Sequence, residues 1–571
     1  MSCPLPFLLV LLPLAAQATL LHVKVPMRDG VRLCTSVFQS AARRGPVVLI
    51  RTPYGKPDSI AGNYKAFVDL GFTLVIQDVR GRHHSAGRFT PPLQERNDGD
   101  DTLNWIATQP WSDGNIAMTG GSYLGISQWH AALSQNKHLK AVFPVVAGSD
   151  DYLDRFYSPG GAFKAGHRLQ WMTENVRAPN FVPVPFSRFV FHLPMRTADR
   201  AATGHAVDFY QRALDHPTYD AYWKGLSVRQ RIPSLRIPFF IVGGWYDNYV
   251  QSDLEAFTAL ARQSPDHRIV IGPWPHNMSY RFTEFDFGPA SGAPIRRYQV
   301  EWFDRWLRGR EPPFNSPPVR LFVMGINQWR DENEWPLSRA VPTPFYLDSG
   351  GNANSLSGDG VLRARPPRRA GEDEFTYDPR NPVPTRGGAV CCNPTVFPWG
   401  PMDQRPVEAR RDVLVFSTEP LRADLEVTGP IRVVLHIATT VPDTDFTAKL
   451  VDVFPDGRAM NLTDGILRLR YRHSLAKAEP ATPGKAYAIT IDAGVTSNVF
   501  RAGHRIRLEI SSSNFPRFDR NPNTGRLISE ETTLRTALQT VFHGPLRPSH
   551  VLLPVVPAAP EPSLTTSAAN R

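Results

Sequence analysis

The chain of 571 residues is 42% hydrophobic and 20% charged, a globular composition that excludes fibrous and disordered proteins. Its net charge of +11 arises from 64 basic residues scattered among 53 acidic ones, so we expect no nucleic-acid partner. The length exceeds one ordinary core and the 54 prolines imply many loops and short strands, so we expect two or three domains and not an all-helical protein.

The N-terminus carries a short apolar run from Leu5 to Leu14, followed by the small-residue pattern Ala15-Ala16-Gln17-Ala18. This pattern is typical of a signal peptide over residues 1–18, and it predicts a secreted or periplasmic protein. The segment carries no Lys or Arg, so a disordered start is the alternative. The run is too short to span a membrane and no other apolar stretch is long enough, so we expect no stable membrane insertion.

Residues 22–38 predict a β-hairpin, and continuous apolar runs typical of strands covered on both faces follow it. Helix-like stretches lie between these runs, so residues 19–149 predict a parallel sheet wrapped by helices. The expected strands are 46–50, 72–76, 115–119 and 141–145, and the expected helices are 64–70, 98–108 and 123–134.

Residues 150–235 interrupt the sheet, because they lack regular strands and are rich in aromatic side chains, and we expect a helical cap there. The sheet resumes over 236–344, with strands at 238–242 and 268–271 and a helix at 253–262. Short alternating segments separated by turn signals predict a β-sandwich over 345–553. The Pro-, Ala-, Ser- and Thr-rich residues 554–571 predict a disordered tail.

A glycine-rich turn, Gly120-Gly121-Ser122-Tyr123-Leu124-Gly125, lies where an expected strand meets a helix. Such an elbow projects a serine hydroxyl above a sheet, although the strict pattern G-x-S-x-G has glycine at position 124. Taken alone, a serine in such a turn is more often ordinary turn chemistry than a nucleophile.

Two further residues follow later strands, Asp247 after Gly243-Gly244 and His276 after Gly272-Pro273. The chain order Ser, Asp, His is that of α/β-hydrolases, and catalytic groups gather at the carboxyl ends of parallel strands. In this arrangement His276 accepts the proton of Ser122, and Asp247 orients the imidazole and stabilises its charged form. Ser122, Asp247 and His276 are therefore the expected catalytic residues.

The oxyanion formed during such a reaction needs donors that are already in place. The backbone N–H of Tyr123 is one candidate. The loop Arg51-Thr52-Pro53-Tyr54-Gly55 follows an early strand, and the phenol of Tyr54 is the second candidate, with a packed aromatic ring as the alternative.

The cysteines leave their pairing open, because removal of Cys3 with a signal peptide leaves Cys34, Cys391 and Cys392. Cys34 pairing with one of the other two is as compatible with the sequence as small buried thiols. No metal-binding spacing is present, and we expect no metal and no cofactor.

The motifs together resemble those of the CocE/NonD family of hydrolases, over nearly all of the chain after residue 18. The resemblance implies an α/β-hydrolase core with an inserted helical cap and a C-terminal β jelly-roll domain. It also implies Ser122 as nucleophile and Tyr54 with the Tyr123 amide as oxyanion hole, in a family that has no glycine at the position of Leu124. The matching segments are Arg51 to Tyr54, Gln77 to Gly81 with Ser85 and Gly87, Gly121 to Gly125, Gly244 to Asp247, Gly272 to Trp274 with His276, Trp302 to Asp304 with Trp306 and Leu307, and Pro442 to Phe446 with Asp452, Val453 and Pro455 to Gly457.

We therefore expect a serine hydrolase that cleaves a small-molecule ester or amide through an acyl-enzyme, with the aromatic cap favouring apolar or aryl acyl groups. The alternatives are an Xaa-Pro dipeptidyl-peptidase and, outside enzymes, a carbohydrate-binding jelly roll on an inactive scaffold. Asp150, Asp151 and Asp154 are candidates for binding a substrate amine, although a solvated helix start is the preferred interpretation. The sequence identifies no other substrate-binding residue and no oligomeric state.

Overall fold

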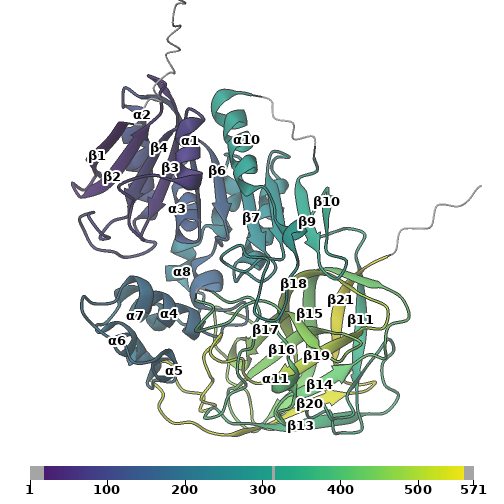
Figure 1. Ribbon diagram of the computed structural model, residues 1–571. Helices are drawn as coiled ribbons and strands as arrows, with labels where there is room; N and C mark the ends of the chain where they lie inside the picture. Colours follow the sequence, from purple (N-terminus) through teal and green to yellow (C-terminus); the bar gives the residue numbers. More distant parts are fainter. Residues whose placement is uncertain (1–18, 311–315, 392, 558–571) are drawn as a thin grey trace, which may run out of the picture.

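The computed structural model describes residues 19–310, 316–391 and 393–557. The expected signal peptide therefore lies outside the described residues. Figure 1 shows a sheet flanked by helices at the top, a group of short helices below it, and a β domain beside those helices. No helix in the described ranges is long and apolar enough to cross a membrane.

The first sheet has ten strands in the order β1-β2-β4-β3-β5-β6-β7-β8-β9-β10. Every adjacent pair from β4 to β9 in this order is parallel, and antiparallel pairs with β2 and β10 continue the sheet at its two edges. Strands β3 and β4 are buried along their whole length, which explains their continuous apolar runs. The strands are β1 (Thr19–Pro26), β2 (Arg32–Gln39), β3 (Gly45–Thr52), β4 (Thr73–Asp78), β5 (Ser112–Gly121), β6 (Leu139–Val145), β7 (Phe240–Gly244), β8 (Arg268–Gly272), β9 (Val319–Val323) and β10 (Gln328–Glu332).

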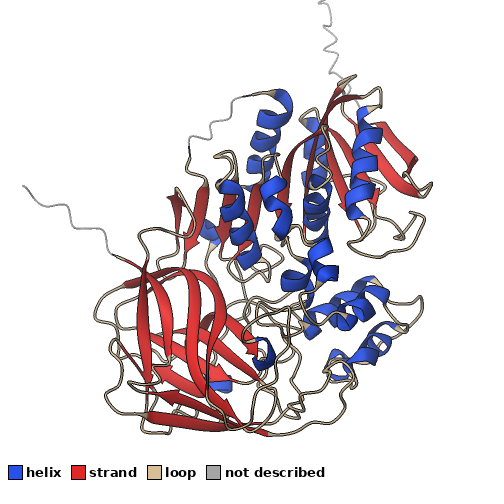
Figure 2. Ribbon diagram, turned by 180° about the vertical axis from the view of Figure 1, so that it is seen from behind, coloured by secondary structure: helices blue, strands red, loops and turns tan. Residues whose placement is uncertain are grey.

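Helices cover both faces of this sheet (Figure 2). Helix α3 starts directly after β5, and α9 connects β7 to β8, so each lies next to an expected catalytic residue. The helices of this part are α1 (Gly62–Asp69), α2 (Glu95–Ala107), α3 (Tyr123–Ala132), α9 (Val250–Ala261), the short η4 (Pro289–Ser291) and α10 (Ile295–Arg308).

A helical insert between β6 and β7 forms the expected cap, and its side chains form a separate hydrophobic cluster rich in aromatic rings. Many short helices with long connections allow these rings to pack around one centre. The elements are the π-helical η1 (Asp151–Phe156), α4 (Ala165–Asn175), α5 (Phe186–Phe189), η2 (Met195–Thr197), α6 (Ala198–Thr203), α7 (Asp208–Asp215), α8 (Ala221–Leu226) and η3 (Arg229–Ser234).

The second sheet forms a mostly antiparallel β domain, in which only β12 and β14 pair in parallel among the described strands. Its strands are β11 (Val341–Asp348), β12 (Val361–Arg363), β13 (Gly371–Tyr377), β14 (Leu414–Ser417), β15 (Leu425–Thr439), β16 (Asp445–Val453), β17 (Ala459–Arg468), β18 (Tyr487–Phe500), β19 (Arg505–Ser511), β20 (Ala537–His543) and β21 (His550–Val556), with the short helices α11 (Arg405–Glu408) and η5 (Leu469–Tyr471).

Two expected boundaries differ from the structure. Strand β11 begins at Val341, so the β domain starts before the expected residue 345. Strand β21 continues to Val556 and pairs with β11 and β15, so the disordered tail expected from residue 554 is wrong for Pro554 to Val556. Backbone pairing on both sides of β21 outweighs the Pro- and Ala-rich composition, and residues 558–571 lie outside the described residues.

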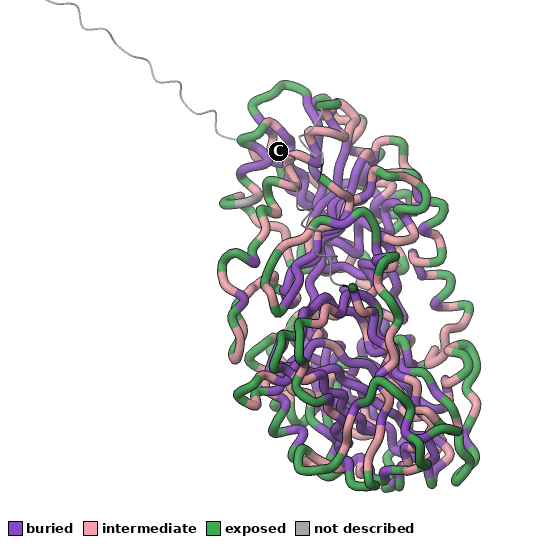
Figure 3. The backbone as a smooth tube through the Cα atoms, turned by 90° about the vertical axis from the view of Figure 1, so that its right-hand side faces the viewer, coloured by how far each residue is buried: buried purple, intermediate pink, exposed green. Residues whose placement is uncertain are grey.

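The interior of the sheet domain and of the β domain is buried, and exposed residues lie mainly on the outside (Figure 3). Cys34 on β2 is a free thiol, whereas Cys391 is disulfide-bonded. A disulfide between Cys34 and Cys391 is therefore excluded.

Candidate active site

Ser122 lies at the sharp turn between β5 and α3. Its backbone has φ 56° and ψ −125°, a conformation that is strained for any residue except glycine. The Ser122 N–H donates to the carbonyl of Val145 on β6 at 2.9 Å, so the neighbouring strand holds the turn in place. Backbone strain of this kind is typical of a nucleophile elbow.

The glycines around Ser122 explain why the turn departs from the strict motif. A Cβ at Gly120 would lie 2.5 Å from Cβ of Leu124, so Leu124 occupies the space that this glycine leaves free. A Cβ at Gly125 would lie 2.3 Å from Cβ of Ala147, so the helix requires glycine here to pack against the segment after β6. The glycine that allows the helix to pack closely therefore lies at position 125, one residue later than in the strict motif.

Asp247 and His276 follow β7 and β8, and they form a hydrogen bond of 2.6 Å between Nδ1 of His276 and Oδ2 of Asp247. Asp247 is fully buried, and its Oδ1 accepts the backbone N–H of Tyr249 at 2.9 Å. The carboxylate is thus held by two donors, which orient it toward one nitrogen of the imidazole. This geometry suits the orienting and charge-stabilising role of an acid in a catalytic triad.

Backbone hydrogen bonds join the loop that follows β7 to the loop that follows β8. The N–H of Trp245 donates to the carbonyl of Gly272 at 2.8 Å, and the N–H of Tyr246 donates to the carbonyl of Trp274 at 3.1 Å. A Cβ at Gly244 would lie 2.2 Å from the Trp274 carbonyl oxygen, so only glycine allows the loops to approach this closely. The glycine before Asp247 therefore contributes directly to the Asp247–His276 distance.

A small cavity of about 20 Å³ lies beside Ser122, with room for about one water. Tyr54 and Tyr123 line it together with Ser122, so three of the five expected site residues meet there. Tyr249 lines the same cavity, and its ring lies 5.7 Å from the ring of His276, which connects the two halves of the site. The other lining residues are Pro91, Ile126, Arg155, Phe156, His167, Arg168, Trp171 and Phe209.

The structure does not bring every expected contact together. Within the described residues the hydroxyl of Ser122 forms no hydrogen bond to His276. Hydrogen bonds between catalytic groups often form or shorten only when the substrate binds, so this structure is compatible with proton transfer from Ser122 to His276. The joint role of the three residues stays a prediction.

The loop that carries Tyr54 rests on a buried polar network. Arg51 at the end of β3 pairs with Glu95 at 2.5 Å, and Glu95 also accepts the phenol of Tyr123 at 2.8 Å. Lys56 donates its backbone N–H to Asp78 at 2.6 Å, which fixes the other side of the loop. The phenol of Tyr123 is therefore engaged below the site, and only its backbone N–H is available to a substrate.

Tyr54 itself is 40% exposed, and its hydroxyl accepts a hydrogen bond of 3.4 Å from Nε1 of Trp171. The hydroxyl can still donate its own proton, because the indole N–H is only a donor. Its position at the open side of the cavity agrees with an oxyanion donor rather than with a ring packed in the core.

Three aspartates expected at a solvated helix start are buried instead, so that interpretation is wrong. Asp150 caps η1 and accepts hydrogen bonds from Tyr219 and Ser227, and Asp151 pairs with Arg155. Burial raises the pKa of Asp154 to about 7. Packing of the cap against the sheet domain buries the chain segment that leaves β6, which the local sequence alone does not show.

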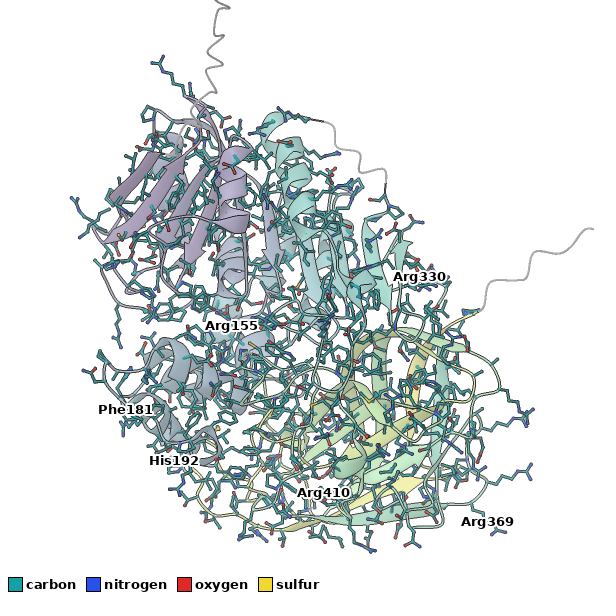
Figure 4. All side chains as sticks on the ribbon, viewed as in Figure 1. Arg155, Phe181, His192, Arg330, Arg369 and Arg410 are labelled. Carbon is teal, nitrogen blue, oxygen red and sulfur yellow. The ribbon has the colours of Figure 1, made fainter. Side chains whose placement is uncertain are left out.

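Sequence reasoning missed the basic residues of the cavity. Arg155 and Arg168 line it beside Ser122, and Figure 4 shows Arg155 between the sheet domain and the cap helices. Burial lowers the pKa of Arg168 to about 10 and the pKa of His167 well below its usual range. At neutral pH Arg168 is therefore charged and His167 neutral. No local motif marks these residues, because only the fold of the cap brings α4 over β5.

Comparisons with known proteins agree with this architecture. A family model described as X-Pro dipeptidyl-peptidase (S15 family) matches residues 29–278. A second model, described as X-Pro dipeptidyl-peptidase C-terminal non-catalytic domain, matches residues 314–552. The cocaine esterase of Rhodococcus sp. (strain MB1 Bresler) is 41% identical over 567 residues, covering 94% of this chain and 98% of that protein.

Solved structures show the same fold over nearly all of the chain. An aminopeptidase from the marine sediment archaeon Thaumarchaeota archaeon is 27% identical with a TM-score of 0.82, covering 98% of this chain and 99% of that one. An α-amino acid ester hydrolase is 26% identical with a TM-score of 0.83, covering 97% and 100%. These likenesses support an enzyme over the carbohydrate-binding alternative. The chain belongs to the CocE/NonD family and is a serine hydrolase of the carboxylic ester hydrolase class.

Proposed function

We propose that Ser122, His276 and Asp247 hydrolyse a carboxylic ester through an acyl-enzyme. The observation that carries this proposal is the 2.6 Å hydrogen bond between buried Asp247 and His276, next to the cavity that Ser122 lines. The Ser122 oxygen attacks the ester carbonyl while His276 takes the hydroxyl proton, and His276 then gives this proton to the departing alcohol. Water releases the acid in the same two steps, with His276 again as base and then acid.

The oxyanion of each tetrahedral intermediate would accept hydrogen bonds from the Tyr123 N–H and from the Tyr54 hydroxyl. Tyr123 is the first residue of α3, so its N–H has no partner within the helix and lies at the positive end of the helix dipole. One such donor contributes about 3 kcal/mol to transition-state stabilisation.

The aromatic rings of the cavity support an apolar or aryl group in the substrate. Phe156, Trp171 and Phe209 all come from the cap, and the Trp171 and Phe209 rings pack edge to face with centroids 6.1 Å apart. The relative at 41% identity is named for a cocaine ester, which agrees with a bulky substrate.

An Xaa-Pro dipeptidyl-peptidase activity is the second candidate, and the names of both family models favour it. A substrate with a free amino group needs a negative partner near the nucleophile. Arg155 and Arg168 line the cavity of Ser122, whereas Asp150 and Asp151 already hold internal partners. The positive charges of the two arginines disfavour a substrate ammonium group in this cavity. They therefore favour an ester hydrolase whose substrate needs no free amine.

The test compares 4-nitrophenyl butyrate with Gly-Pro-4-nitroanilide, each with the unchanged protein and with Ser122→Ala. We expect turnover of the ester alone, and its loss in the variant. Cleavage of the anilide at the higher kcat/KM would favour the peptidase, and equal ester turnover by both proteins would remove Ser122 from the mechanism.

Export is a separate proposal that rests only on the apolar run of residues 1–18. N-terminal sequencing of protein recovered from the periplasm or medium of a bacterium that expresses the full chain should find residue 19 first, and an intact N-terminus in the cytoplasm would contradict it.

A further inference from the structure

Arg168 is a buried cation in the wall of the nucleophile's cavity. It is 5% exposed, and it lines the cavity together with Ser122 and Tyr54. Helix α4 places it three residues before Trp171, so both side chains lie on the same face of the helix. The guanidinium lies 5.6 Å from the Trp171 ring and 5.1 Å from the Phe156 ring, both of which also line the cavity.

Among the residues that the structure describes, no acidic side chain pairs with the charge of Arg168. Its one side-chain hydrogen bond within the described part of the chain joins its terminal nitrogen to Nε2 of His167 at 2.9 Å, and a neutral His167 accepts this bond without cancelling the charge. Its Nε atom is buried and has no partner, and no carboxylate in the described ranges forms an ion pair with it. Arg155 differs in this respect, because Asp151 pairs with it.

Such an arrangement is costly for the fold. Burying an unpaired cation costs free energy, and two cation–π contacts offset only part of this cost. Arginine also presents a planar set of donors that matches a carboxylate. A buried arginine with unused donors beside a nucleophile is therefore arranged for a negative group that arrives with the substrate.

We propose that Arg168 binds a carboxylate of the substrate, so that the enzyme prefers esters carrying a second, ionised carboxyl group. This inference rests on the proposed ester hydrolysis at Ser122 and adds the charge of the substrate to it. The carboxylate could belong either to the acyl part, as in the half-ester of a short dicarboxylic acid, or to the leaving group, as in an ester of a hydroxybenzoate. Arg168 then acts in binding, and its loss affects KM more than kcat.

Two matched pairs of esters separate charge from size. The first pair is mono-4-nitrophenyl glutarate and its neutral amide, 4-nitrophenyl 4-carbamoylbutanoate. The second pair carries the charge on the leaving group and consists of 3-carboxyphenyl valerate and 3-carbamoylphenyl valerate. The kcat/KM ratio of charged to neutral ester is measured for each pair with the unchanged protein, Arg168→Leu, Arg168→Lys and Arg200→Leu.

In one of the pairs the unchanged protein should prefer the charged ester by about 10-fold or more, and Arg168→Leu should lower this ratio by about 10²-fold. Arg168→Lys, which keeps the charge, should retain part of the preference. Arg200→Leu removes a charge from an exposed position on α6 of the same cap and should leave the ratio unchanged.

The pair that shows the effect assigns the carboxylate to the acyl part or to the leaving group. Equal rates for charged and neutral esters in the unchanged protein overturn the inference, even if Arg168→Leu does not fold. A loss of the same size for both members of each pair in Arg168→Leu also overturns it, because it indicates a structural role. If Arg168 does not bind a carboxylate, turnover of neutral esters that depends on Ser122 would still support the proposed ester hydrolysis. No turnover of any ester would contradict both the ester hydrolysis and the role of Arg168.

Discussion

Replacing Asp247 by asparagine keeps the shape of the side chain and removes its charge. The carboxylate now accepts from His276 through Oδ2 and from the Tyr249 N–H through Oδ1. Asparagine has a single acceptor oxygen, and the buried Tyr249 N–H requires it, so the NH₂ group would face His276. It would donate to Nδ1 and fix the tautomer in which Nε2 carries the proton, which cannot accept the proton of Ser122.

The size of the effect follows from the lost charge. Two unit charges about 4 Å apart interact by about 4 kcal/mol at an effective dielectric constant of about 20. This corresponds to about 10³-fold in rate, and the wrong tautomer adds to it. We therefore expect Asp247→Asn to lower kcat for 4-nitrophenyl butyrate by at least about 10³-fold, with a change in KM below about threefold.

Asp253→Asn is the matched control. Asp253 is also buried, in the first turn of α9, and burial together with the charges of Asp247 and Asp154 raises its pKa well above its usual range. Burial disfavours the charged form of this carboxyl, and within the described residues no hydrogen bond joins it to His276, so replacing it by an amide should change kcat by less than about fivefold. A kcat for folded Asp247→Asn within about tenfold of the unchanged protein would refute the reasoning.

Three further predictions concern the site and its support. Tyr54→Phe should lower kcat about 10²-fold with little change in KM if its hydroxyl meets the oxyanion, and steady-state kinetics with an unchanged kcat would remove that role. Gly125→Ala should cost about 1–3 kcal/mol, because the new Cβ would lie 2.3 Å from Cβ of Ala147, so an unaltered midpoint of thermal unfolding would contradict the packing argument. Burial lowers the pKa of His267 to about 4, so its stabilising contribution is complete above pH 6.5 and is lost as the pH falls toward 4. The stability difference between the unchanged protein and His267→Gln should therefore shrink by up to about 2 kcal/mol between pH 7 and pH 5, and urea unfolding that shows a constant difference would contradict this.

The order of the elements could be predicted because the sheet strands are continuous apolar runs. Strands β3 and β4 carry this signal strongly, and the cap was marked by the absence of such runs. The end of β21 was missed, because the Pro-, Ala-, Ser- and Thr-rich composition of residues 554–571 suggests a tail, whereas pairing with two neighbouring strands decides the structure of Pro554 to Val556. Local composition cannot report such long-range pairing.

The residues of the site also fall into those that the sequence could predict and those that it could not. Ser122, Asp247 and His276 each follow a strand, so their common edge of the sheet could be predicted from the sequence. Arg168 and Tyr249 could not, since neither belongs to a motif that the strand pattern marks. Their place in the cavity depends on how the cap folds back over the sheet, and the burial of Asp150 and Asp151 has the same cause.

The most direct test of the central claim is covalent labelling of the nucleophile. The protein is treated with one equivalent of a fluorophosphonate, residual esterase activity is measured, and the labelled peptide is identified by mass spectrometry. We predict loss of activity in proportion to a single phosphonyl group on Ser122, and no labelling of Ser122→Ala. Complete inactivation with the label on another residue, or an active protein fully labelled at Ser122, would contradict the account.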